Sequence, residues 1–207
     1  MKIITISREF GSGGRELGKR LADVLGFDYY DKEIISTIAE NKGLSEGYVE
    51  NILENHGWQN IPLNYGHSFI CLNPMISTQT DLLFEQKEVI EKIAKSNKDC
   101  IIVGRNADVL LKDYNTFNIF VCANMEDKVA RCLERSREDE NLNDKEVRKL
   151  IKKIDKNRAR THELISDSIW GHSDSYHLTI NTSGWEIKEL VPAVAEFINH
   201  YFDRKTK

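Results

Sequence analysis

The chain has 207 residues, of which 40% are hydrophobic and 30% are charged, and this fits one globular domain with a small inserted lobe. Its formal net charge of −4 argues against a protein that is held to nucleic acid by bulk electrostatics. No apolar run approaches the length of a membrane span, and the first residues lack a signal-peptide pattern, so we expect a cytoplasmic protein with no membrane partner.

An apolar run, a glycine cluster and an amphipathic pattern open the chain in that order. Residues 2–7 predict a strand, and Leu17, Leu21 and Leu25 repeat at helical spacing. The glycine cluster at 11–14 therefore joins a strand to a helix N-terminus. Backbone N–H groups converge at such a turn, and the helix dipole adds positive potential. We predict a phosphate-binding turn; a glycine-rich turn without a ligand is the alternative.

The literal pattern of a Walker A loop, G-x-x-x-x-G-K, runs from Gly13 to Lys19. Arg20 follows it, where a Ser or Thr should hold magnesium. This register also places Leu17 in the loop, although the helical pattern has already begun there. Lys19 would then lie more than one turn inside the helix, too far along to reach a phosphate. We therefore reject this register.

In the other register the loop begins at Arg8, where the predicted strand ends. The usual lysine position is then Gly14, and the usual Ser or Thr position is Arg15. A guanidinium offers a planar fork of donors that grips phosphate oxygens bidentately. We expect Arg15 to be the nearest cation of an altered phosphate loop.

Strand-like and helical patterns alternate along the rest of the chain. Further strands are predicted at 27–30, 100–103, 117–122 and 176–181. Helices are predicted at 14–25, 32–41, about 80–96, 125–138, 144–165 and 185–202. This alternation predicts an α/β fold with a parallel sheet, in which ligands bind at the carboxyl ends of the strands.

Residues 43–78 interrupt the alternation, because glycines and prolines break any long periodicity there. A short helix is predicted near 45–55, followed by a loop-rich lobe. This segment is either a cap over a substrate or a surface excursion without a role.

Charged residues follow two of the predicted strands. Asp31 comes directly after the second strand, where it either caps the next helix or contacts a substrate. Gly104 and Arg105 follow the third strand, and the glycine permits close approach of a ligand. Arg105 is either a phosphate clamp or the partner of a structural carboxylate.

The helices predicted at 125–138 and 144–165 are rich in arginine. Asn124 is expected to cap the first, with Asp127 at the reciprocal position of a capping box. Arg131 and Arg135 lie four residues apart on one face of it, and the second helix carries Arg158. Two such helices joined by a polar segment are typical of a mobile lid over phosphates, and a solvated charged hairpin is the alternative.

The cysteines are widely scattered, at Cys71, Cys100, Cys122 and Cys132. They form no C-x-x-C pair, and the histidines add no metal-site spacing. We expect buried free thiols and no metal-ligating residues.

Several of these segments together resemble the cytidylate kinase-like branch of the P-loop nucleoside monophosphate kinases. Residues 5–19 resemble the start of a cytidylate kinase without gaps, residues 102–105 its strand ending in Gly-Arg, and residues 155–159 its second lid helix. The resemblance implies a three-layer P-loop NTPase fold with a parallel sheet, a small helical substrate-binding insertion and a helical lid. It implies a single domain over 1–207, with its core at about 1–42, 80–138 and 166–207, the insertion at about 43–79 and the lid at about 131–165.

The implied activity is ATP-dependent phosphoryl transfer to a nucleoside monophosphate such as CMP or dCMP. Magnesium would be held mainly through the phosphates and water. The residues implied to hold the ATP phosphates are Gly11, Ser12, Gly13, Gly14, Arg15 and Glu16. The implied catalytic residues are Arg15, Arg131, Arg135 and Arg158, and the implied acceptor ligands are Asp31, Arg105, Asp155 and Arg158.

The chain departs from the family pattern in two places. The loop lysine and the magnesium-binding hydroxyl are absent at Gly14 and Arg15, and residues 43–78 carry no cytidylate-specific motif. A nucleotide-binding relative with little or no catalysis and a kinase for another small acceptor are therefore rival hypotheses. Small-molecule nucleotides are the expected partners, nucleic acid is not, and the oligomeric state stays open.

Overall fold

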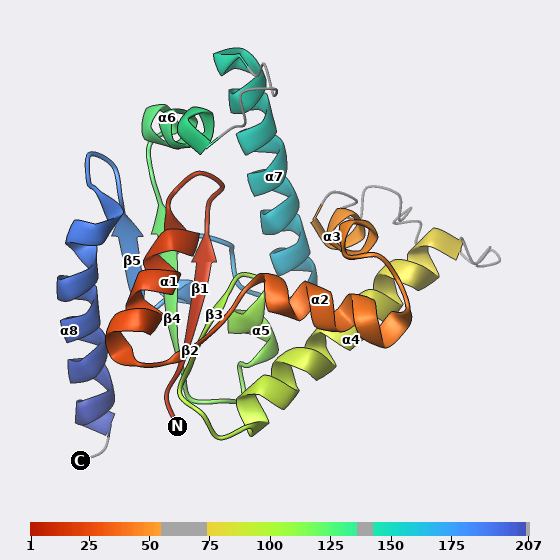
Figure 1. Cartoon of the computed structure of the whole chain (residues 1–207), viewed down its shortest axis with the longest axis horizontal. Coiled ribbons are helices and arrows are strands. Elements are labelled where there is room, and N and C mark those ends of the chain that lie inside the picture. The colour runs from red at the N-terminus through yellow and green to blue at the C-terminus, as the bar shows by residue number, and fades with distance from the viewer. Residues whose placement is uncertain (55–73, 136–142, 206–207) are drawn as a thin grey trace.

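A five-stranded parallel sheet forms the centre of the computed structural model, which describes residues 1–54, 74–135 and 143–205 (Figure 1). The strands lie in the order β2-β3-β1-β4-β5. Their bounds are β1 Ile3–Arg8, β2 Asp28–Tyr30, β3 Cys100–Val103, β4 Thr116–Cys122 and β5 Leu178–Asn181. The predicted α/β fold with a parallel sheet is confirmed, and each predicted strand is present within two residues of its expected bounds.

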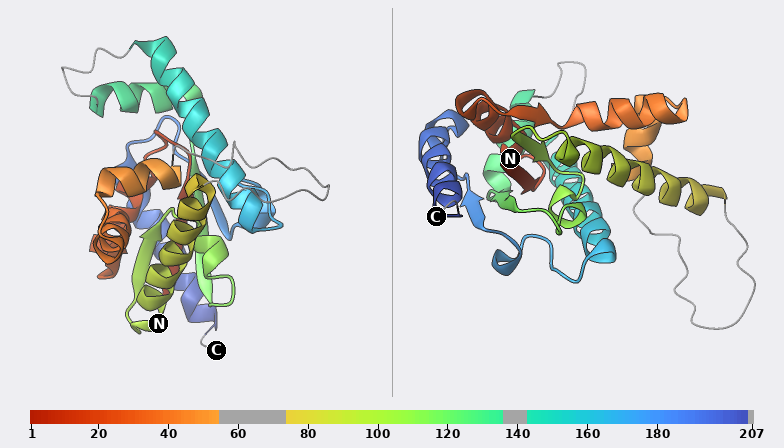
Figure 2. Two further views of the ribbon diagram at one scale, coloured as in Figure 1. Left: turned by 90° about the vertical axis from the view of Figure 1, so that its right-hand side faces the viewer. Right: turned by 90° about the horizontal axis from the view of Figure 1, so that it is seen from below.

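Helices cover both faces of the sheet and its carboxyl end. Their bounds are α1 Gly14–Leu25, α2 Lys32–Lys42, α3 Glu46–Glu54, α4 Pro74–Lys95, α5 Ala107–Leu110, α6 Met125–Arg135, α7 Asp144–Ile165 and α8 Ile187–Lys205, with a 3-10 turn at Ser173–Ser175. Helices α1 and α8 lie on one face, α4 and α5 lie on the other, and α6 and α7 lie above the strand ends (Figures 1 and 2). The result is the three-layer arrangement that the resemblance implies.

The two faces of the sheet are both apolar because side chains alternate along buried strands. Ile4 and Ile6 of β1 pack in the core beneath α1 and α8, which also contains Phe117 and Ile198. Ile3 packs on the opposite face with apolar residues of α2, α3, α4 and α5. Each strand of the centre therefore anchors two cores at once.

Two helical features differ from the sequence prediction. Helix α4 begins at Pro74, six residues before the predicted start, and α5 was not predicted. Helix α5 is only four residues long, too short for a periodic pattern, and it follows Gly104, Arg105 and Asn106, which all have positive φ. The last three residues of the predicted helix 125–138 lie outside the described residues.

The predicted capping box at α6 is half formed. The Asp127 N–H donates to Asn124 Oδ1 over 2.7 Å, as expected of a cap. The Asp127 carboxylate does not reciprocate, because its Oδ2 accepts the N–H of Gly184 at 2.9 Å. A complete capping box occurs instead at the start of α7, between Asn143 and Glu146.

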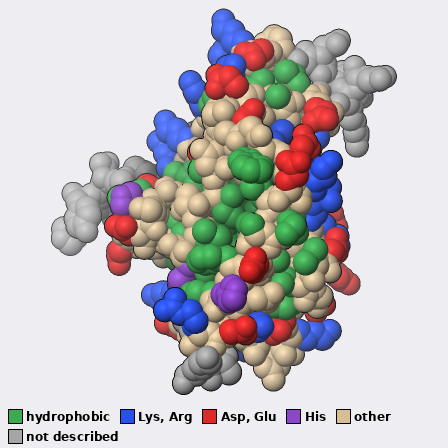
Figure 3. Space-filling model, turned by 90° about the vertical axis from the view of Figure 1, so that its left-hand side faces the viewer, with side chains coloured by type: hydrophobic (Ala, Val, Ile, Leu, Met, Phe, Trp, Pro, Cys, Tyr) green, Lys and Arg blue, Asp and Glu red, His purple; other side chains and the backbone are tan. Residues whose placement is uncertain are grey.

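The surface on the α8 side mixes charges of both signs around a central group of hydrophobic side chains (Figure 3). The exposed hydrophobic residues of α1, α8 and the turn between β5 and α8 include Val24, Trp185 and Phe197. Within the described residues, no helix combines the length and apolar character needed to cross a bilayer. Cys100 is buried, Cys122 and Cys132 are partly exposed free thiols, and Cys71 lies outside the described residues.

Candidate active site

The loop between β1 and α1 presents a set of unpaired backbone amides. Gly11 and Gly13 have φ of 77° and 81°, a left-handed conformation that favours glycine, and Gly13 is the N-cap of α1. Within the described part of the chain, no acceptor is found for the N–H groups of Gly11, Gly13, Gly14, Arg15 and Glu16. Unpaired amides at a helix N-terminus form an anion site, as the glycine cluster predicts.

A buried lysine of α6 holds the start of this loop. Lys128 Nζ lies 3.1 Å from Glu9 Oε2 and 2.9 Å from Asp155 Oδ2. Asp155 Oδ1 also accepts the Phe10 N–H at 2.7 Å, and Glu9 Oε2 accepts the Ala123 N–H at 3.1 Å. Burial alone would lower the pKa of Lys128, but its bonds to the two carboxylates outweigh burial and raise the pKa above its ordinary value. The charged lysine therefore links the start of the loop, through Glu9, to α7, through Asp155.

Arg8, the last residue of β1, runs through the space beside two glycines. A Cβ at Gly14 would lie 2.7 Å from the Cβ of Arg8, and a Cβ at Gly104 would overlap the Arg8 guanidinium. The Arg8 residue is only 8% exposed, and its Nη2 lies 3.7 Å from Asp31 Oδ1. The position of the usual loop lysine is therefore crowded by the stem of an arginine from the neighbouring strand.

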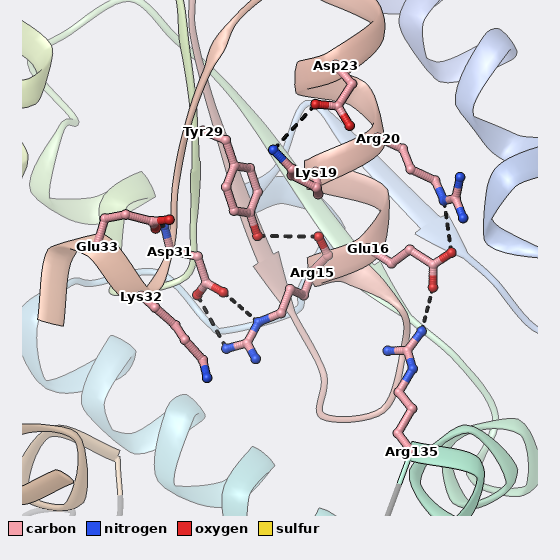
Figure 4. A pocket seen from close by; sticks show the side chains of 10 residues that line it. All are labelled: Arg15, Glu16, Lys19, Arg20, Asp23, Tyr29, Asp31, Lys32, Glu33 and Arg135. Atoms are coloured by element: carbon pink, nitrogen blue, oxygen red, sulfur yellow. Dashed lines mark hydrogen bonds and ion pairs between the residues drawn. The ribbon is translucent and has the colours of Figure 1, made fainter. Parts of the chain in front are cut away.

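Arg15 reaches from the start of α1 to the end of β2 (Figure 4). Its Nε lies 2.5 Å from Asp31 Oδ2, and the Asp31 side chain is 3% exposed. The capping interpretation of Asp31 is wrong, because its carboxylate makes no capping hydrogen bond and pairs with Arg15 and Arg8 instead. A helix start can be capped from solvent, whereas a buried carboxylate needs a cation.

A cavity of about 370 Å³, here named the loop cavity, opens on the loop amides. Five arginines line it: Arg8, Arg15, Arg131, Arg135 and Arg158. Arg131 is fixed by bonds from its Nη2 to the carbonyl oxygens of Thr182 and Trp185, at 2.8 and 3.1 Å. Arg135 pairs with Glu16 at 2.5 Å (Figure 4). Glu9 and Glu50 are the acidic residues of the described lining, so the cavity has an excess of positive charge.

A smaller cavity of about 50 Å³, here named the β3 cavity, lies at the carboxyl end of β3. Its lining combines three arginines with amide, hydroxyl and apolar side chains: Arg8, Arg105, Arg158, Gln86, Asn106, Asn157, Thr161, Leu53 and Leu83. The backbone of Arg105 has φ of 59°, and the buried side chain of Gln86 donates to its carbonyl oxygen over 2.9 Å. Gln86 therefore holds a strained segment that brings Arg105 to the cavity.

Two residues line both cavities, Arg8 and Arg158. Arg158 Nη1 donates to the carbonyl oxygen of Arg8 over 3.1 Å, and its guanidinium lies 5.7 Å from the centre of the Phe10 ring. Helix α7 thus places one arginine beside the other at the boundary of the two cavities.

The other predicted site residues differ in their position relative to the two cavities. Arg131, Arg135, Gly11, Gly13, Gly14 and Arg15 line the loop cavity, whereas Ser12 and Glu16 do not, and Arg105 lines the β3 cavity. Asp155 lines neither described cavity, since its carboxylate is engaged with Lys128 and Phe10. Within the described ranges, no three His, Cys, Asp or Glu side chains are grouped as a metal site.

Sequence reasoning did not identify Arg8, Lys128 or Gln86 as site residues. A signal existed for Arg8, which ends a strand and precedes a loop with glycine at the lysine position. Lys128 and Gln86 occupy ordinary amphipathic helices, where nothing local distinguishes them from surface residues.

Comparison with known proteins agrees with this geometry. The model of the cytidylate kinase-like family matches residues 3–184. A search of curated proteins finds no match. Among solved structures, an uncharacterized protein from Eubacterium ventriosum is 24% identical, with a TM-score of 0.67 over 96% of this chain and 99% of that one.

Two similar structures are shikimate kinases, and they share the fold of this chain. The one from Bacteroides thetaiotaomicron is 14% identical, with a TM-score of 0.59 over 96% of this chain and 98% of that one. The one from Acinetobacter baumannii, in complex with shikimate, is 15% identical, with a TM-score of 0.53 over 97% and 94%.

Proposed function

The chain belongs to the cytidylate kinase-like family, and on that premise we propose that it transfers the γ-phosphoryl group of ATP to a nucleoside monophosphate, CMP or dCMP. The observation that carries the proposal is the pair of adjoining cavities, which share Arg8 and Arg158. The loop cavity takes the phosphates of the donor, and the β3 cavity, at about 50 Å³, takes the phosphate group of the acceptor.

The donor side is supported by backbone amides and fixed cations. The unpaired N–H groups of Gly11, Gly13, Gly14, Arg15 and Glu16 would face the donor phosphates, and Arg15, Arg131 and Arg135 add positive charge around them. Phosphoryl transfer depends on positioning and charge stabilisation rather than on covalent chemistry by the protein. Because the described residues group no metal ligands, Mg²⁺ would be held through the phosphates and water, where it supplies further charge neutralisation.

The acceptor side favours a nucleophile that is already an anion. An alcohol must lose a proton during transfer and benefits from a carboxylate base, whereas a phosphate oxygen does not. Among its described lining residues, the β3 cavity has no carboxylate and three arginines. An oxygen of the monophosphate forms a bond to the γ-phosphorus while the bond from that phosphorus to the bridging oxygen breaks. The electron pair leaves with ADP, and the products are ADP and a nucleoside diphosphate.

The domain organisation forms part of the same proposal. Residues 1–207 would act as one kinase unit, with 43–79 as the substrate-binding insertion and 131–165 as the lid. Within the described part of the insertion, helix α3 meets the site, through Glu50 at the loop cavity and Leu53 at the β3 cavity. Residues 55–73 and 136–142 lie outside the described residues.

A coupled assay for ADP tests the proposal, with ATP and Mg²⁺ offered together with CMP, dCMP, UMP, AMP or GMP, and with shikimate as an alcohol acceptor. We expect nucleoside diphosphate formation with CMP or dCMP and none with shikimate. Calorimetric titration with each nucleotide separates the rivals. Binding without transfer would identify a nucleotide-binding relative, and transfer to shikimate would identify another small-molecule kinase. Absence of binding to any nucleotide would refute the proposal.

A further inference from the structure

We propose that Arg8 is the catalytic cation of this loop and does the work of the absent lysine from the end of strand β1. The inference rests on the proposed function, since it assigns a residue to the same phosphoryl transfer. Its guanidinium would contact the phosphoryl group as that group passes from the loop cavity to the β3 cavity.

The first argument is steric. A Cβ at Gly14 would lie 2.7 Å from the Arg8 Cβ, 3.2 Å from its Cγ and 3.2 Å from the Val121 Cβ. A lysine at position 14 would therefore collide with the stem of Arg8, so this fold holds one of the two cations and not both. The arginine can occupy this space only because the lysine is absent. The loop has therefore exchanged one cation for another and has not lost its positive charge.

The second argument comes from the far end of the side chain. Gly104, at the end of β3, has φ of 73°, and a Cβ there would overlap the Arg8 guanidinium. Two glycines that are distant in sequence thus leave room for one side chain, at its root and at its tip. A glycine pair of this kind defines the path of Arg8 from β1 toward the β3 cavity.

The third argument is charge. Asp31 is shared between two arginines, with Arg15 at 2.5 Å and Arg8 at 3.7 Å. The Arg15 side chain is 48% exposed and closely paired, whereas the Arg8 side chain is 9% exposed and lines both cavities. A buried cation acts more strongly on a nearby phosphate, because water screens it less.

In the reaction step, Arg8 donates N–H hydrogen bonds to the oxygens of the phosphoryl group and transfers no proton. Negative charge on those oxygens and on the bridging oxygen is redistributed as one P–O bond forms and the other breaks. A fixed guanidinium at the boundary stabilises that charge throughout the transfer.

The test is a series of variants: Arg8→Ala, Gly104→Ala and the double variant Arg8→Gly with Gly14→Lys. Lys19→Ala is the matched control, since Lys19 is a cation of the adjoining helix α1 but is 59% exposed and pairs with Asp23. Each variant is checked for folding by circular dichroism. The readouts are kcat and KM for the transfer from ATP to CMP and the calorimetric Kd for inorganic tripolyphosphate.

We expect Arg8→Ala to lower kcat about 100-fold, in the range seen when one preorganised donor to a transition state is removed. Its Kd for tripolyphosphate should rise about tenfold, as for a lost hydrogen bond to a charged group. Gly104→Ala should lower kcat by moving the guanidinium, and Lys19→Ala should change neither quantity. The double variant, which exchanges the arginine of β1 for a lysine at the start of α1, should recover most of the tripolyphosphate affinity that Arg8→Ala loses.

A folded Arg8→Ala variant with unchanged kcat and Kd would overturn the assignment. Should that variant not fold, a folded double variant without tripolyphosphate affinity overturns it equally. If the natural chain binds tripolyphosphate but transfers phosphate to no acceptor, the proposed function fails. The Kd values of the variants for tripolyphosphate would still show whether Arg8 binds the phosphates. A natural chain that binds neither ATP nor tripolyphosphate would overturn both.

Discussion

Replacement of Lys128 by methionine should lower the free energy of unfolding by about 3 kcal/mol, the lower end of the cost of breaking a buried ion pair. The Lys128 side chain is 5% exposed and faces the carboxylates of Glu9 and Asp155, which are 25% and 15% exposed. Without the lysine these two like charges remain together. The lower end applies because each carboxylate keeps a backbone donor, Ala123 N–H for Glu9 and Phe10 N–H for Asp155.

Urea unfolding followed by circular dichroism measures this cost. Lys95→Met is the matched control, because Lys95 pairs with Glu91 at 3.0 Å but is 63% exposed, so water and salt screen its pair. This control should leave the unfolding midpoint unchanged. Addition of Glu9→Gln to Lys128→Met should restore part of the lost stability by removing one of the two charges. A Lys128→Met variant as stable as the natural chain would refute the reasoning that burial makes this pair strong.

Three further predictions concern buried groups. Asp108→Leu removes a carboxylate that is 5% exposed and lies 3.1 Å from Nε2 of His162, which is 1% exposed. A thermal melt should show that the free energy of unfolding falls by about 2 kcal/mol, and by less in Asp108→Asn. Burial raises the pKa of Cys100 from 9.0 to about 12, so the folded thiol keeps its proton while the unfolded one ionises, and the free energy of unfolding falls as pH rises from 9 to 12. Urea titrations over that range should show a shallower fall in Cys100→Ala, and an equal slope would contradict the shift. Thr182→Val removes a fully buried hydroxyl that donates to the Ser12 carbonyl at 2.7 Å and accepts from Arg131 at 3.0 Å. The KM for ATP should therefore rise, and the free energy of unfolding should fall by about 1 kcal/mol. An unchanged KM would show that this hydroxyl does not position the loop.

The parts of the fold that sequence reasoning predicted are those whose cause is local. Largely apolar runs of four to seven residues define β1, β3 and β4, and the spacing of Leu17 and Leu21 places α1 directly after the glycine cluster. The order of strand, glycine loop and helix is sufficient to predict an anion site. Each of these inferences uses residues within about one turn of one another.

The parts that sequence reasoning missed depend on residues that are distant along the chain. The role of Asp31 is decided by Arg8 and Arg15, which lie 23 and 16 residues before it, and a local pattern offers only a cap. Lys128 is buried because it pairs with Glu9 and Asp155, which lie 119 and 27 residues away from it along the chain. Folding on the sheet brings these charges together, so no single segment carries the signal.

The path of Arg8 leads to a prediction about relatives of this chain. If one cation serves the loop, the residues at positions 8, 14 and 104 must vary together. A relative with lysine at position 14 should carry glycine at position 8, because any Cβ there would lie within 3 Å of the lysine Cβ. A side chain at position 104 should occur only where position 8 lacks a long cation, because the guanidinium occupies that space.

An alignment of the family tests this rule directly. Frequent pairing of arginine at position 8 with a non-glycine residue at position 104 would show that the two glycines serve the backbone alone. In that case the steric argument for Arg8 would lose its support. Concerted variation would instead mean that each relative keeps one cation at this loop, carried either by position 8 of the strand or by position 14 of the helix.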